Sequence, residues 1–233
     1  METSGLFQQG IGEAANLLIS LDRGMIGVVS VSLFVALIST LIAALLGLPI
    51  GYIIAMVPFP GRRAAATILN TMLALPTVVV GLFAYGLLSR RGMLGFLDLL
   101  YTPWAMIVGE TVLALPIVAA LTLTALRSVD SRVYDTAATL GANTTQVAKK
   151  LILEARYGIL AAIVASFGRV IAEVGAAMML GGNIRNSTRT MTTAIALETN
   201  KGEFGLALAL GLILLLVALG ANVMFHWLQG FNE

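Results

Sequence analysis

Three long stretches of this 233-residue chain contain no charged side chain. They cover residues 24–61, 64–89 and 204–225. Each is at least as long as the apolar helix of roughly 20 residues that crosses a hydrocarbon core about 30 Å thick. Hydrophobic residues make up 58% of the chain and charged residues 11%, whereas a typical soluble domain is about 25% charged. Such a chain cannot hide its apolar side chains in a compact water-soluble body, so we expect the bilayer to be its solvent.

Hydropathy and charge together predict an all-α membrane protein with five transmembrane helices. The predicted spans are residues 26–57, 64–88, 103–126, 157–181 and 204–228. Pro49 predicts a kink in the first span, and Pro58 its end. The third span carries Glu110, and the fourth carries Arg169 and Glu173. Ionisable residues inside a span face the interior of a bundle or a wet cavity, so they are candidates for function.

Two regions are predicted along the chain. Residues 1–24 predict a short amphipathic helix that lies in the membrane interface, because apolar residues recur there at helical spacing between polar ones. Residues 25–230 are predicted to form a single transmembrane domain.

The tetrad LALP occurs twice in this domain, at Leu73–Pro76 and at Leu113–Pro116. A proline within a span bends its helix, so the repeat indicates either two bent helices that line a cavity or a coincidence in an Ala/Leu-rich chain.

A polar segment, residues 127–156, separates the third and fourth spans. A loop that only returned the chain to the membrane would need a handful of residues. Asp130 or Ser131 can cap a first short helix that Gly141 would end, and Asn143 or Thr144 can cap a second. We therefore expect a rigid helix–turn–helix knob, here called the docking loop, that binds a partner at the membrane surface.

The docking loop resembles that of the membrane subunits of ABC importers. In that family the loop carries Glu-Ala-Ala-x-x-x-Gly, nine further residues, and Ile-x-Leu-Pro. This chain departs from the pattern where Thr136 replaces Ala, Leu151 replaces Ile and Glu154 replaces Pro. The resemblance implies a type I ABC importer permease fold with a cytoplasmic coupling helix. It also implies that the ATPase docks at Asp135, Thr136, Ala137, Ala138, Gly141 and Ala142.

Within that family the chain is most similar to the oxyanion branch, which comprises tungstate, molybdate and sulfate permeases. Residues 167–184 look like that branch's Arg…Glu-x-Gly…Gly-Asn-Ile signature, and residues 185–198 look most like tungstate permeases. The resemblance implies a homodimer with two cytoplasmic ATP-binding subunits and an extracytoplasmic oxyanion-binding protein. It implies a bacterial or archaeal inner membrane, with the N-terminus outside and the C-terminus in the cytoplasm. Basic residues do not decide orientation, since seven lie in the loops of one side and six in those of the other.

Two groups of residues are candidates for contact with an anion. Arg169, Glu173 and Gly175 are predicted to form the translocation path or its gate, although a mutually neutralising pair that only locks helix packing is an equal alternative. An external contact with the anion or its binding protein is predicted for Asn183, Arg185, Thr188 and Arg189. The alternative for that segment is a solvated re-entrant loop.

Several functions are excluded by what the sequence lacks. It has no cysteine, which removes disulfides and Cys-based metal sites, and no Gly-x-x-x-x-Gly-Lys-[Ser/Thr] motif, so ATP must be hydrolysed on partner subunits. Scattered basic residues give no footprint for nucleic acid, and we expect no cofactor. A rival function is an ion-coupled secondary transporter with Arg169, Glu173 and Glu110 as a relay, and another is a membrane scaffold. Such transporters often have more spans and inverted repeats.

Overall fold

The computed structural model describes residues 11, 12, 15 and 23–230, and the predicted interfacial helix at 1–24 lies almost entirely outside them. Within the described residues every regular element is a helix. The elements are α2 (Arg23–Met56), α3 (Arg62–Met72), α4 (Thr77–Leu88), the 3₁₀ turn η1 (Gly95–Leu97), α5 (Pro103–Arg127), α6 (Ser131–Thr139), α7 (Thr144–Glu154), α8 (Arg156–Ile171), α9 (Gly175–Gly181), α10 (Met191–Lys201) and α11 (Phe204–Gly230).

Three helices, α2, α5 and α11, are each long and apolar enough to cross a membrane. Two pairs of shorter helices pass the same test together but are bent. The α3–α4 pair bends by 99° and the α7–α8 pair by 63°. Counting each bent pair as one span gives five, so the prediction of an all-α membrane protein is confirmed.

The second predicted span, 64–88, is broken at its LALP tetrad. Helix α3 ends at Met72 and α4 begins at Thr77, with Pro76 at its N-cap position in an extended conformation. Proline has no N–H to continue the helix, and it pushes the preceding residue away from helical dihedrals. The second tetrad behaves differently, because α5 continues through a buried Pro116 as a single helix. Helix α2 likewise continues through Pro49.

The fourth predicted span, 157–181, is wrong as a single helix. Helix α8 ends at Ile171, and α9 begins only at Gly175. The side chain of Glu173 accepts a hydrogen bond from the backbone N–H of Ala176 at 3.2 Å. That bond satisfies an N–H at the start of α9 that has no partner within the helix, and it stabilises the break.

Helices α2 and α5 pack closely against each other because α2 carries glycines on the contact face. A Cβ atom added to Gly51 would lie 2.6 Å from the carbonyl oxygen of Ala119, and one added to Gly47 would lie 3.0 Å from Val118. Small residues let helix backbones approach in membranes, where van der Waals packing drives association. Helix α8 packs against α5 in the same way, since its Gly158 lies against Ala125 of α5.

The turn after α2 is fixed by one arginine. The Nε atom of Arg62 donates to the carbonyl oxygen of Ile54 at 2.7 Å, and its Nη2 donates to that of Ala55. These carbonyls belong to the last turn of α2, where no backbone N–H follows to satisfy them. Gly61, with φ of 87°, supplies the left-handed turn that brings Arg62 back onto the helix end.

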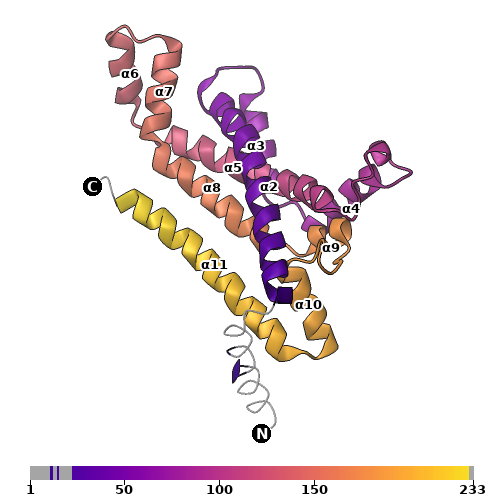
Figure 1. Cartoon of the computed structure of the whole chain (residues 1–233). Coiled ribbons are helices and arrows are strands. Elements are labelled where there is room, and N and C mark those ends of the chain that lie inside the picture. Colours follow the sequence, from indigo (N-terminus) through magenta and orange to yellow (C-terminus); the bar gives the residue numbers. More distant parts are fainter. Residues whose placement is uncertain (1–10, 13–14, 16–22, 231–233) are drawn as a thin grey trace.

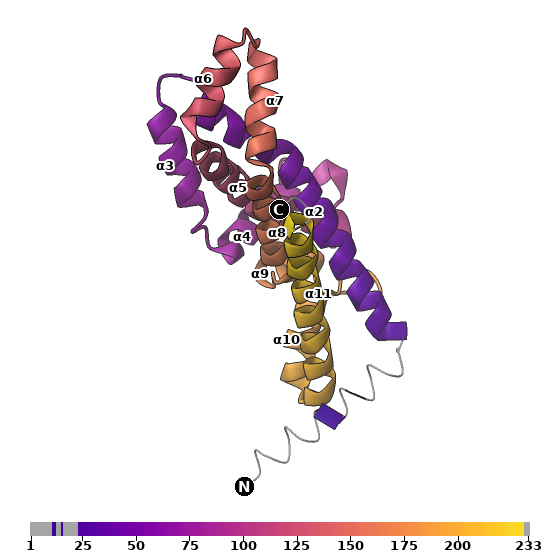
Figure 2. The ribbon, with the colours of Figure 1, turned by 90° about the vertical axis from the view of Figure 1, so that its left-hand side faces the viewer.

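The elements place two polar regions at opposite ends of the molecule (Figure 1). Helices α6 and α7 project at one end, here called the docking end, beside which the last turns of α11 lie. Helix α10 and the first turns of α2 and α11 lie at the other end, here called the rim end. The view turned by 90° shows the same separation (Figure 2). Helices α2 and α11 therefore both run from the rim end toward the docking end.

Candidate functional site

The docking loop folds as the predicted helix–turn–helix. The carboxylate of Asp130 caps α6 by accepting the backbone N–H of Arg132 at 2.9 Å. Asn143 caps α7 in a reciprocal capping box with Gln146, with bonds of 3.0 and 2.8 Å. Between the two helices Gly141 adopts φ of 77°, a backbone conformation that residues other than glycine rarely adopt. Local capping and one glycine thus define the shape of the knob.

A second contact reinforces the first cap. The Arg132 guanidinium also donates to Asp130 Oδ2, with Nε at 2.8 Å. This charged hydrogen bond holds the pKa of Asp130 below its usual range. Both side chains are solvent-exposed, so the pair orients the start of α6 more than it stabilises the fold.

The knob presents some of its predicted docking residues and buries others against the core. Asp135, Thr136, Ala138 and Gly141 are exposed, whereas Ala137 and Ala142 pack against the buried cluster at this end of the bundle. Between α6 and α7 there is a cleft of about 690 Å³. Its lining includes Arg132, Thr136, Ala137, Leu140, Lys150 and Glu154.

Two exposed apolar residues on the knob were missed by the sequence reasoning. Leu140 is 82% exposed and Tyr134 is 53% exposed. An apolar residue directly before the helix-ending glycine was the signal available in the sequence. Exposed apolar side chains on a polar helical projection are typical of a surface that binds another protein.

Arg169 and Glu173 form an ion pair, with Arg169 Nη1 2.7 Å from Glu173 Oε2. The Glu173 side chain is 4% exposed and that of Arg169 is 43% exposed. Glu173 lies beyond the end of α8, so the pair bridges the break between α8 and α9. The Thr192 hydroxyl donates to the carbonyl oxygen of Glu173 at 2.7 Å, which ties the break to α10. One buried acid therefore joins three helices.

Other candidates near this break have partners within the chain. Gly175 packs against α4, because a Cβ atom there would lie 2.9 Å from Val78 Cγ2. Glu110 is buried in α5 and accepts a hydrogen bond from the Ser39 hydroxyl at 3.4 Å.

The rim loop, residues 182–190, is built from most of the residues predicted to contact an anion. Thr188 is fully buried; its hydroxyl donates to the carbonyl oxygen of Gly181 and accepts the N–H of Ile184. Arg189 donates to both the side-chain and backbone oxygens of Asn183, at 3.2 and 3.3 Å. In this conformation Asn183, Thr188 and Arg189 hold the loop together, while Arg185 is exposed.

The overall fold matches solved structures of transporters. A chain of a methionine ABC transporter in an inward-facing conformation aligns with a TM-score of 0.73 and 17% identity, over 90% of this chain and 96% of that chain. Residues 47–230 match the family described as the binding-protein-dependent transport system inner membrane component. The chain belongs to this family. It is the membrane permease of an ABC importer, and the ATPase and the binding protein are separate components.

Three permeases similar in sequence indicate the branch of the family to which the chain is related. A probable anion ABC transporter permease of Haloferax volcanii is 41% identical, over 86% of this chain and 88% of its own length. A tungstate uptake system permease of Peptoclostridium acidaminophilum is 37% identical over 95% of this chain and 97% of its own length. The corresponding permease of Campylobacter jejuni is 39% identical over 94% and 92%. The predicted oxyanion branch of the ABC importer permeases is confirmed.

Proposed function

We propose that this permease conducts tungstate, with molybdate as the alternative substrate. The observation that carries the proposal is identity of 37% and 39%, over almost the full chain, to two tungstate uptake permeases. A divalent oxyanion cannot cross lipid without a polar path, because an unpaired charge in hydrocarbon costs many kcal/mol. Arg169 is the cation that we assign to this path.

Two copies of the chain are proposed to form the path between them. Arg169 is 43% exposed on the surface of a single chain, although its helix is part of a membrane span. A charged side chain within a membrane span does not face lipid, so a second protein surface or a water-filled path must lie against Arg169. Ala165 is exposed one turn before it, and the space beside Gly168 is open. Small residues at this face would let a second α8 approach closely.

In this proposal the docking end lies in the cytoplasm. The exposed residues Asp135, Thr136, Ala138 and Gly141, together with Leu140, then bind the ATP-binding subunit. The N-terminus would lie outside and the C-terminus inside, which agrees with the opposite ends at which α2 starts and α11 finishes (Figure 1). The rim loop faces outward and forms the contact with the binding protein.

The proposal is tested by transport in proteoliposomes that contain the permease, its ATPase and its binding protein. Tungstate uptake should require ATP on the ATPase side and should continue after an ionophore collapses the ion gradients. Uptake without ATP, or uptake that stops with the gradient, would show an ion-coupled carrier instead. Competition with molybdate and with sulfate then ranks the substrates. If sulfate inhibits uptake as well as tungstate does, the assignment to tungstate is wrong.

A further inference from the structure

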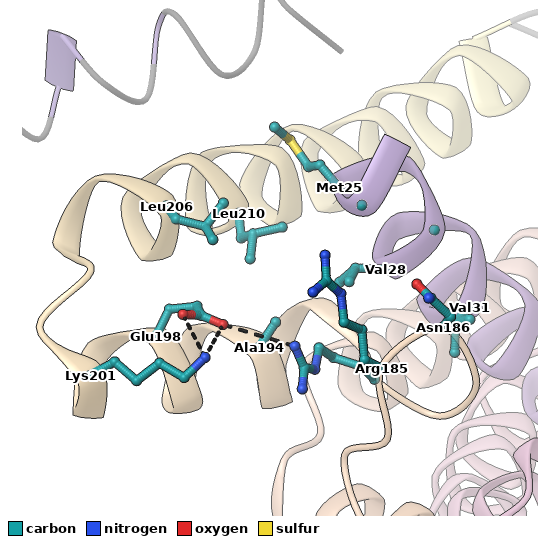
Figure 3. Close-up of a pocket in the computed structure, with 13 residues that line it drawn as sticks. Met25, Val28, Val31, Arg185, Asn186, Ala194, Glu198, Lys201, Leu206 and Leu210 are labelled. Carbon is teal, nitrogen blue, oxygen red and sulfur yellow. Dashed lines mark hydrogen bonds and ion pairs between the residues drawn. The ribbon is translucent and has the colours of Figure 1, made fainter. Parts of the chain in front are cut away.

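A pocket of about 250 Å³ lies at the rim end, between the first turns of α2, the rim loop, α10 and the first turns of α11 (Figure 3). Its polar side contains Arg185, Arg189, Lys201 and Glu198. The Glu198 carboxylate lies 3.1 Å from Lys201 Nζ and 3.9 Å from Arg189 Nη1. With three cations and one carboxylate, the polar side has two positive charges in excess.

Arg185 is the cation that these contacts do not use. In the part of the chain that the structure describes, no carboxylate forms an ion pair with Arg185. Its side chain points into the pocket toward Val28 of α2 (Figure 3), and Arg189 is the arginine that pairs with Glu198. The buried Glu198 holds Arg189 and Lys201 in place, and Arg185 and Lys201 both remain exposed to a ligand.

The opposite side of the pocket is apolar and belongs to two membrane spans. Met25 and Val28 lie in the first turns of α2, and Leu206 and Leu210 lie in the first turns of α11. Both helices are candidate spans that start at this end. The pocket therefore lies where a span leaves the hydrocarbon and meets the lipid headgroups, and its cations lie on the water side of its apolar wall.

We propose that this pocket binds one anionic phospholipid, with its phosphate on Arg185 and Lys201 and the start of an acyl chain along α2 and α11. Phosphate oxygens accept charge-assisted hydrogen bonds, which guanidinium and ammonium groups donate. Basic clusters at the membrane surface attract anionic lipids, each cation contributing in additive fashion. A small hydrated oxyanion would use the cations but gain nothing from the apolar wall, whereas a phospholipid uses both sides. The site is independent of which substrate the permease transports.

The test measures lipid retention by native mass spectrometry of the permease purified with its ATPase. The complex is exchanged into detergent with equal amounts of phosphatidylglycerol and phosphatidylcholine. The wild-type chain should retain phosphatidylglycerol in preference, with its affinity weakened about fivefold for each cation removed in Arg185→Gln and in Arg185→Gln/Lys201→Gln. The single variant leaves both ion pairs of Glu198 intact. Arg91→Gln removes an exposed cation of another loop and should behave as the wild type.

Two outcomes would overturn the proposal. One is equal retention of phosphatidylglycerol by the wild type and both pocket variants, or an equal loss in Arg91→Gln. The other concerns soluble anions added to the retained complex. If glycerol 3-phosphate or tungstate displaces phosphatidylglycerol from the wild type at the concentrations at which the lipid itself competes, the pocket recognises a free oxyanion and not a lipid.

Discussion

Substitutions at the Arg169–Glu173 ion pair can separate a role of Arg169 in transport from a role of the pair in helix packing. Arg169→Ala would leave the Glu173 carboxylate buried with one remaining hydrogen bond, from the N–H of Ala176 at 3.2 Å. Breaking a fully buried pair costs about 3–5 kcal/mol. Because the Arg169 side chain is 43% exposed, solvent screens the pair, and we expect a loss of about 2 kcal/mol. That corresponds to a fall in melting temperature of about 4–8 °C for a chain of this size.

A second substitution removes the unpaired charge. In Arg169→Ala/Glu173→Gln the buried side chain is neutral and can still accept the N–H of Ala176, so most of the lost stability should return. Transport should not return if Arg169 contacts the passing anion. A charge-assisted hydrogen bond is worth about 1.5–3 kcal/mol, so uptake in both variants should be about 10- to 100-fold below that of the wild type.

The assays are thermal melting of the purified complex and ATP-dependent tungstate uptake by the same preparation. Arg91→Ala, which removes an exposed arginine from a different loop, is the matched control. Recovery of both stability and uptake in the double variant would mean that the pair only locks the helices together. No change of melting temperature in Arg169→Ala would refute the claim that the carboxylate of Glu173 depends on its partner.

Three further predictions concern single residues. Gly141→Val forces a branched side chain into a conformation with φ of 77°, which costs about 1–2 kcal/mol or more, so the ATPase should no longer copurify while membrane insertion is unchanged. Gly51→Ala places a Cβ atom 2.6 Å from a carbonyl oxygen of α5 and should lower stability by about 1–3 kcal/mol; Gly211→Ala, which meets nothing within 4 Å, should not. Because Arg132 lowers the pKa of Asp130, the cap on α6 should persist below the ordinary Asp pKa of about 3.9 and be lost only as pH falls through the lowered value. The carboxyl carbon shift of Asp130 in NMR follows this titration, and Arg132→Ala should move its midpoint upward.

The docking loop was predictable because its structure is local. Asp130 and Asn143 accept backbone N–H groups two or three residues further along the chain, and Gly141 turns the chain between the two helices. Such interactions depend on a few neighbouring residues, so their sequence pattern carries the information. The presence of an apolar tip at Leu140 was not inferred, since its exposure depends on how the two short helices stand away from the core.

The break after Ile171 was not predictable from hydropathy, because residues on both sides of it are apolar. It depends on contacts from distant parts of the chain, including the Thr192 hydroxyl on the carbonyl oxygen of Glu173. The rim loop gives a similar lesson. Thr188 was predicted as an external contact with the anion or its binding protein; its side chain is fully buried, and its hydroxyl satisfies the backbone at Gly181 and Ile184. Polar residue types predict that hydrogen bonds form, and the tertiary fold decides with which partner.

The 63° bend between α7 and α8 occurs across a single residue, Ala155, which is itself buried. Because only one residue separates the two helices, a rotation of α7 about Ala155 would be transmitted directly to α8. Arg169 lies 14 residues along α8, about 21 Å from Ala155 at 1.5 Å per residue. A rotation of about 10° at Ala155 would sweep the backbone of Arg169 through about 3–4 Å, by the same helix geometry. Glu173 lies two residues beyond α8 and is tied to α9 and α10 through Ala176 and Thr192, so a movement of α8 against these two helices would strain its ion pair with Arg169.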